Sequence, residues 1–114
     1  MRPFKLWVVV GEKPFINVPK ATLRKLLNKN GRVKKVEFRR SMSPLQIKNR
    51  IISSFPTLRL ESPIFMKCVE LKMVHVDIEG GTDGYPCGSV IQSIASKESL
   101  YLVESKVNFK LLIL

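Results

Sequence analysis

The chain has 114 residues, of which 45% are hydrophobic and 25% are charged, and this composition is typical of one folded domain rather than of a disordered segment. No apolar run reaches the roughly 18 residues that a membrane span requires, and Phe4 to Val10 is too short for the hydrophobic region of a signal peptide. Two cysteines, Cys68 and Cys87, are too few for a disulfide scaffold or a zinc site. We therefore expect reduced thiols in an intracellular protein, either cytoplasmic or nuclear.

The N-terminal residues predict a strand with apolar side chains on both of its faces. From Phe4 to Val10 the even-numbered residues are all apolar, and the odd-numbered ones include Trp7 and Val9. This pattern suits a central strand that is covered on part of each side. Turn residues follow from Gly11 to Pro14, and Phe15 to Val18 fits either a short second strand or an extended segment.

A short helix is predicted to open at Pro19 and to end at Asn30-Gly31. Three leucines share its apolar face, namely Leu23, Leu26 and Leu27. Basic residues are expected to project outward from it, namely Arg24, Lys25 and Lys29.

A basic strand and a well-marked helix follow. The strand is predicted from Val33 to Arg39, with Val36 and Phe38 facing inward. Ser43 and Gln46 fit a capping box, with Pro44 at the first helical position between them. The helix is expected to stop at Pro56, and its apolar stripe comprises Leu45, Ile47, Ile51, Ile52 and Phe55.

The second half of the chain predicts a hairpin, a loop, a short helix and a last strand. The hairpin joins Ile64–Glu70 to Met73–Ile78, and the glycine-rich loop runs from Glu79 to Gly88. Val90, Ile91 and Ile94 suggest a turn or two of helix, and Leu100–Val103 predicts the final strand. Val107–Leu114 is nearly all apolar and fits an extra strand, an ordered tail or a truncated end.

Together these elements predict an α+β fold, with one main helix packed on a mixed sheet of four or five strands. The order of these elements resembles the β-grasp fold of ubiquitin-like domains: a first strand, a second strand, one long helix, a strand pair, a short helix and a last strand. More narrowly, four short runs resemble poorly characterised ubiquitin-like domains that accompany HECT-type ubiquitin ligase regions in multidomain animal proteins. These runs are Val36-Glu-Phe-Arg39, Ser54-Phe-Pro56, Asp83-Gly-Tyr-Pro86 and Leu100-Tyr-Leu-Val103. The expected ubiquitin-like domain spans residues 1–105, with an extra short helix between its first two core strands, and residues 106–114 form an apolar tail or truncated end.

This resemblance implies a non-catalytic protein-interaction module that is linked to ubiquitin transfer. The chain departs from ubiquitin because Gly11 to Val33 is far longer than ubiquitin's tight hairpin, and because the sequence contains no HECT catalytic cysteine region. It ends in Leu-Ile-Leu, and its only Gly-Gly pair is the internal Gly80-Gly81. We therefore do not expect a conjugated modifier.

Charge is distributed unevenly and supplies the main functional hypothesis. Residues 1–60 carry 15 Lys/Arg and 2 Glu, whereas residues 61–114 carry 5 Lys and 7 Asp/Glu. This asymmetry predicts a basic face that binds an acidic protein surface, and a face that is merely solvated stays open as the alternative. The candidate partner-binding residues are Arg24, Lys25, Lys34, Lys35, Arg39 and Arg40.

Nucleic acid is the other partner that this basic face could bind. Lysines and arginines bind phosphates without sequence preference, but single-stranded bases also need an exposed aromatic side chain beside the charges. Trp7 is the only candidate near the basic residues, and no RNA-binding consensus is present.

An acidic loop carries Asp77, Glu79 and Asp83 around Gly80-Gly81. It fits a solvated turn, a cation site without the regular spacing of a calcium loop, or a surface for weak self-association with the basic strand of another copy.

Enzyme chemistry is not expected from this sequence. His75 is the only histidine and has no histidine partner for a metal, and a Cys68–His75 pair has undetermined geometry across the predicted hairpin. We therefore expect no catalytic residues, no metal and no cofactor.

Overall fold

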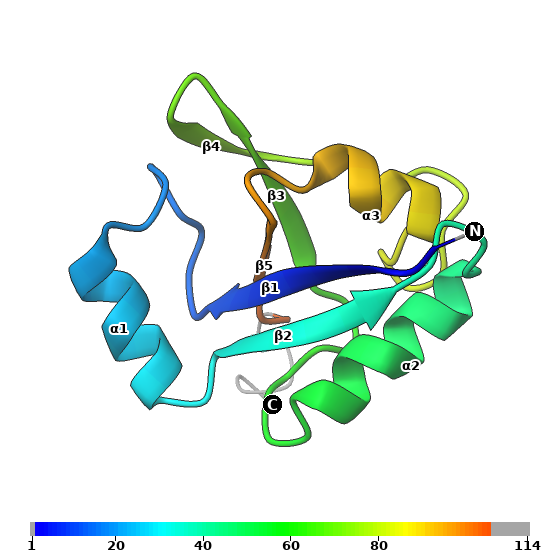
Figure 1. Ribbon diagram of the computed structural model, residues 1–114, viewed down its shortest axis with the longest axis horizontal. Helices are drawn as coiled ribbons and strands as arrows, with labels where there is room; N and C mark the ends of the chain where they lie inside the picture. Colours follow the sequence, from blue (N-terminus) through cyan, green and yellow to red (C-terminus); the bar gives the residue numbers. More distant parts are fainter. Residues whose placement is uncertain (1, 106–114) are drawn as a thin grey trace, which may run out of the picture.

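Five strands pair into one mixed sheet in the order β2-β1-β5-β3-β4 (Figure 1). The computed structural model describes residues 2–105. The strands are β1 (Phe4–Gly11), β2 (Val33–Phe38), β3 (Ile64–Val69), β4 (Lys72–His75) and β5 (Ser99–Val103). The helices are α1 (Ala21–Lys29), α2 (Pro44–Ser54) and α3 (Gly88–Ile94). The predicted α+β class and mixed sheet are confirmed.

The two central strands are β1 and β5, and they run parallel to each other. β1 pairs with β2 in antiparallel register, and β5 pairs with β3, which forms a hairpin with β4. Val8, Val9 and Val10 have no exposed surface, and every residue of β5 is buried. The apolar residues on both faces of β1 are thus explained by its central position.

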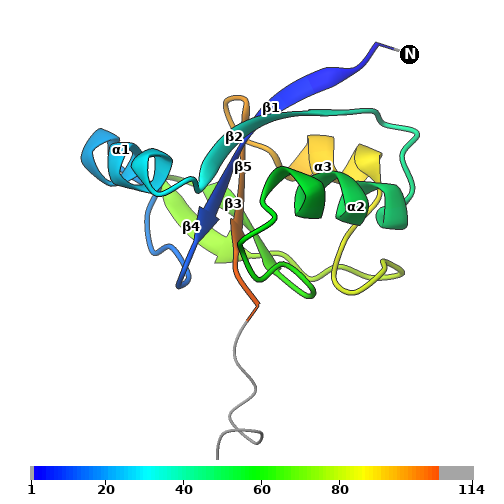
Figure 2. The ribbon, with the colours of Figure 1, turned by 90° about the horizontal axis from the view of Figure 1, so that it is seen from below.

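One face of the sheet is covered by α2 and α3, which lie side by side on it in Figure 2. The buried stripe of α2 is confirmed at Ile47, Ile51 and Phe55, which pack with Val36 and Phe38 of β2 in one core cluster. Leu45, expected to widen that stripe, is exposed.

The start of α2 is set by the capping box that the sequence predicts. The Gln46 N–H donates to Ser43 Oγ at 3.2 Å, and the Ser43 N–H donates to Gln46 Oε1 at 2.8 Å. Of the four positions at the helix start that lack an intrahelical N–H partner, Ser43 and Gln46 are therefore satisfied locally, and Pro44 has no N–H to satisfy.

The other face is covered at one end by α1 and the segment before it (Figure 2). Leu27 of α1 and Phe15 of that segment pack with Val9 and Tyr101 in a second cluster. Phe15–Val18 is an extended segment rather than a strand, and a single bridge joins its Asn17 to β4.

Several predicted boundaries shift by a few residues. α1 begins at Ala21 instead of Pro19, and β4 ends at His75 instead of Ile78. The hairpin turn lies at Glu70 and Leu71, which both have positive φ. The predicted segment Val107–Leu114 lies outside the described residues. Within residues 2–105, no helix has the length and apolar character to cross a membrane.

Candidate functional site

Trp7 lies on the face of the sheet opposite α2 and α3, beyond the area that α1 covers. Alternation along β1 places it on this face beside Lys35, its cross-strand partner on β2. The Trp7 side chain is 38% exposed, and Lys35 Nζ lies 5.4 Å from the centroid of the indole ring. This is the geometry of a cation–π contact, and it leaves part of the ring open to solvent.

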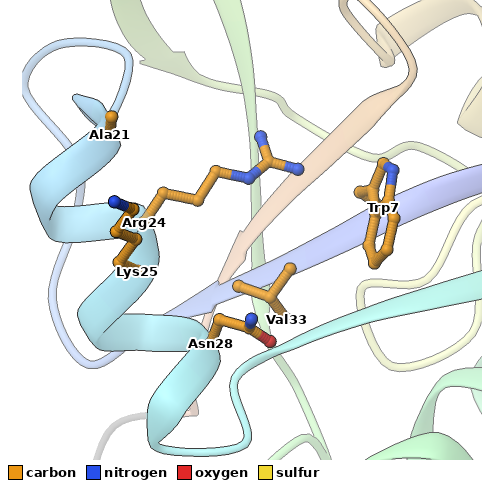
Figure 3. A pocket seen from close by; sticks show the side chains of 6 residues that line it. All are labelled: Trp7, Ala21, Arg24, Lys25, Asn28 and Val33. Atoms are coloured by element: carbon orange, nitrogen blue, oxygen red, sulfur yellow. The ribbon is translucent and has the colours of Figure 1, made fainter.

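Arg24 reaches this place from α1. Its Nη1 donates to Ser99 Oγ at 3.0 Å, and Ser99 is the partner of Trp7 in the register between β1 and β5. Figure 3 shows the Arg24 side chain extending from the helix toward the sheet on the side where Trp7 lies. Arg24 is thus half-buried and fixed, and the expectation that it projects outward from the helix is wrong.

A shallow pocket of about 300 Å³ lies between α1 and the sheet (Figure 3). Its lining residues are Trp7, Ala21, Arg24, Lys25, Asn28 and Val33. The indole supplies an apolar wall, and the guanidinium of Arg24 supplies donors in a planar fork that matches a carboxylate or a phosphate. We refer to Trp7, Arg24, Lys25 and Lys35 as the Trp7 site.

The positive charge of the Trp7 site is not neutralised by ion pairs within the described residues. Within residues 2–105, Arg24, Lys25 and Lys35 form no ion pair, whereas Arg32 pairs with Glu12 and Glu104. Nearby acidic groups are few: Glu37 stands opposite Lys5 on the strand pair, and Glu98 lies in the turn before β5. The site can therefore attract an anionic group without first breaking a salt bridge.

Lys34 does not belong to this site, although it is adjacent to Lys35 in the sequence. Its Nζ donates to the backbone oxygen of Ser54 at 2.7 Å and lies 5.4 Å from the centroid of the Phe55 ring. Lys34 thus faces α2, where its charge satisfies a carbonyl at the negative end of the helix.

Arg39 and Arg40 are also separated from the Trp7 site. They follow β2, at the end of the strand away from α1, and both are exposed (Figure 1). Their backbone packs closely against Gly88 at the start of α3. Of the six predicted partner-binding residues, the structure brings together Arg24, Lys25 and Lys35.

Asn28 and Ser99 were not predicted as part of a site. Ser99 is buried and positions Arg24, and Asn28 adds an amide to the pocket wall. The only available signal was that Asn28 lies one helical turn after Arg24 and Lys25, on the same side of α1.

The acidic loop lies apart from the basic face, beside α2. Lys48 Nζ is 2.5 Å from Asp83 Oδ2, so one of its three acidic residues is already paired within the chain. Asp77 and Glu79 are exposed. Across residues 2–105, no group of three His, Cys, Asp or Glu side chains is placed to hold a metal ion.

The two thiols and the histidine occupy different surroundings. Cys68 is opposite Met73 in the hairpin, and His75 is opposite Met66, so the two stand diagonally on one face, and no hydrogen bond joins them in the described part of the chain. Cys87 Sγ lies 3.2 Å from Ser89 Oγ, and this contact lowers the pKa of the Cys87 thiol.

Comparisons of the chain with protein-family models, with curated protein sequences and with solved structures found no match.

Proposed function

We propose that the chain is a non-catalytic protein-interaction module of β-grasp fold that binds an acidic partner through the Trp7 site. Support for the β-grasp assignment comes from the strand order, in which the first and last strands are parallel neighbours at the centre of the sheet. The main helix packs on one face, and hairpin partners flank the central pair. The helix α1 is then an insertion between the first two strands of that fold.

The observation that carries the proposal is the convergence of Arg24, Lys25 and Lys35 around a partly exposed Trp7. Three cations that form no ion pair within residues 2–105 favour carboxylate groups of a partner, and Arg24 is already oriented by Ser99. Tryptophan and arginine are the residues that most often dominate binding energy in protein interfaces. The charges would set the rate and orientation of encounter, and burial of the indole would lengthen the life of the complex.

A role linked to ubiquitin transfer is the context we favour for this module. It rests on the resemblance of short sequence runs to domains that accompany HECT-type ligase regions. In this context the module would recruit an acidic protein, and another domain would catalyse ubiquitin transfer.

Nucleic acid is the second candidate partner, and the exposure of Trp7 beside the cations is what favours it. A partly open indole can stack on an unpaired base while Arg24 and Lys35 contact phosphates. Against it, the pocket is small, and Arg39 and Arg40, which follow the end of β2, do not line it.

A fluorescence titration separates the two candidates, because Trp7 is the only tryptophan and reports from the site itself. We expect polyglutamate at ~50 mM salt to change the Trp7 emission in a saturable way. Random single- and double-stranded oligonucleotides should have a weaker effect at the same charge concentration. The double variant Arg24→Glu/Lys35→Glu should abolish the response to polyglutamate.

Arg50→Glu/Arg59→Glu is the matched control, since it changes the net charge equally at two exposed arginines in and beyond α2. If the control loses binding as completely as the site variant, the response is a property of net charge and the proposed site is wrong. Stronger binding of oligonucleotides than of polyglutamate would favour the nucleic-acid function instead.

The acidic loop of a second copy of the chain is another candidate partner for the Trp7 site. Asp77 and Glu79 lie in the loop between β4 and α3, so contact of that loop with the Trp7 site of another copy would be head to tail. Weak association of this kind would make the Trp7 emission depend on protein concentration, and Asp77→Lys/Glu79→Lys would remove that dependence.

A further inference from the structure

A second, larger depression lies on the other side of α1 from the Trp7 site. It has a volume of about 1080 Å³ and is bounded by α1 and the segment 11–20 that precedes it. Helix α1 thus separates two surfaces, and of the four residues of the Trp7 site only Lys25 borders both. We call this depression the α1 groove.

The α1 groove exposes large apolar side chains that the fold leaves without partners. Ile16 is 81% exposed, Leu23 is 42% exposed and Leu26 is 54% exposed, whereas Leu27 is the only buried residue of α1. Leu23 and Leu26 are three residues apart and form one ridge along the helix. The sequence predicts that all three leucines share an apolar face, but the sheet end accommodates only one of them.

The rim of the α1 groove is strongly basic. Four lysines border it, namely Lys13, Lys20, Lys25 and Lys29, and none of them forms an ion pair within residues 2–105. The one acidic residue on the rim is Glu12, which lies 3.3 Å from Arg32 Nη2. Exposed apolar side chains bordered by lysines are complementary to an apolar stripe flanked by carboxylates.

The segment 11–20 offers little free strand edge, because the side that faces β4 is already paired and because Pro14 and Pro19 have no backbone N–H. The Ile16 oxygen accepts from the Met73 N–H at 2.9 Å, and the Val18 N–H donates to the Leu71 oxygen at 3.3 Å. A partner therefore cannot add a strand at these positions, and side-chain packing against the ridge of α1 remains. An amphipathic helix fits this mode of binding.

We propose that the α1 groove binds an acidic amphipathic helix of a partner protein. Large apolar residues of that helix, spaced at i, i+4 and i+7, pack on Ile16, Leu23 and Leu26, and its acidic residues face the four rim lysines. The depression between α1 and the segment 11–20 lets a helix pack against apolar side chains on both of its flanks. The α1 groove shares only Lys25 with the Trp7 site.

The test uses a fluorescein-labelled peptide of about 16 residues with leucines at this spacing and glutamates on its remaining face. Fluorescence polarisation at ~150 mM salt measures its affinity for the full chain, since remote charges are largely screened there. Leu26→Asp and Ile16→Asp should each weaken binding at least tenfold. Both residues are exposed, so both variants are expected to fold, and circular dichroism checks this.

Leu45→Asp is the matched control, because Leu45 is 53% exposed on α2, nearly the same as Leu26, and lies outside the groove. The control and the double variant Arg24→Glu/Lys35→Glu should bind the peptide within about twofold of the unmodified chain. If Arg24→Glu/Lys35→Glu loses the response to polyglutamate but binds the peptide normally, the Trp7 site and the α1 groove bind their ligands separately.

Three results overturn the inference. One is unchanged peptide affinity in both Leu26→Asp and Ile16→Asp, and another is an equal loss in Leu45→Asp. The third is that the peptide does not bind, whereas vesicles containing anionic lipid bind the unmodified chain and do not bind Leu26→Asp. The apolar side chains of the groove would then bind a membrane surface instead of a helix.

Discussion

At the scale of single residues, Tyr85 is the polar side chain most firmly built into the core. It has no exposed surface, its hydroxyl donates to the Leu60 oxygen at 2.6 Å, and its ring meets the Phe65 ring edge-on at 5.6 Å. The hydroxyl thus ties the segment after α2 to the loop before α3.

Tyr85→Phe should lower the free energy of unfolding by about 1 to 2 kcal/mol. The ring and its packing on Phe65 are kept, but the Leu60 carbonyl loses its buried donor. Urea denaturation followed by circular dichroism measures the change. Tyr101→Phe serves as the comparison in the second core cluster, and a Tyr85→Phe variant as stable as the unmodified chain would show that the hydrogen bond contributes nothing.

The unmodified chain and Tyr85→Phe should also differ in how their stability depends on pH. Burial of Tyr85, followed by the charges of Glu61 and Asp83, raises the pKa of its hydroxyl well above the ordinary value of 10.0. The fold therefore favours the protonated hydroxyl, and this contribution to stability is complete below pH 10.0 and declines above it, as the unfolded tyrosine ionises. Stability should consequently fall more steeply above pH 10.0 in the unmodified chain than in Tyr85→Phe.

The burial of some residues could be predicted from the sequence, whereas the position of other side chains could not. The sequence correctly predicts Val36 and Phe38 as buried, because strand alternation fixes which neighbours share a face. It also shows that Lys34 and Lys35 are on opposite faces, yet charge clustering groups them together. The inward course of Arg24 could not be predicted, since its partner Ser99 is 75 residues away in the chain.

At the scale of elements, Gly88 determines how closely α3 approaches the turn between β2 and α2. Its N–H donates to the Met42 oxygen at 2.9 Å, and a Cβ at this position would overlap the backbone oxygen of Arg39. The glycine is required for this close approach, because both α2 and α3 must lie on the same face of the sheet.

Gly88→Ala should therefore destabilise the chain by about 2 to 3 kcal/mol, since backbone atoms have to move apart. Gly31→Ala is the contrasting variant: Gly31 has φ +73° at the end of α1, but open space surrounds it, so strain alone should cost about 1 kcal/mol. Thermal or urea unfolding measures both. Equal stability losses in the two variants would contradict a close contact between α3 and the Arg39 backbone.

The elements themselves were largely predictable, and the reason differs from one to the next. The start of α2 follows from Ser43 and Gln46, since a capping box is a local signal. The role of α1 was not predictable in the same way. Its leucine periodicity indicates an amphipathic helix, but the number of leucines that find partners depends on how much sheet lies beneath it.

At the scale of the whole molecule, the fold redistributes a charge asymmetry that is continuous in the sequence. The six predicted partner-binding residues lie within positions 24–40, but the structure assigns Lys34 to the face covered by α2 and moves Arg39 and Arg40 to the far end of β2. Arg24, Lys25 and Lys35 remain together because α1 crosses the end of the sheet beside β2. The predicted patch is thus reduced to a smaller site that includes Trp7.

We propose that this smaller site, rather than the whole basic stretch, binds an acidic partner. Two-dimensional nuclear magnetic resonance of the ¹⁵N-labelled chain, titrated with polyglutamate, tests it most directly, because each amide and the Trp7 indole N–H report separately. We predict that the largest shifts occur at Trp7, Arg24, Lys25 and Lys35 and vanish in Arg24→Glu/Lys35→Glu. Shifts that centre on Arg39 and Arg40, or that leave the Trp7 indole unchanged, would contradict the claim.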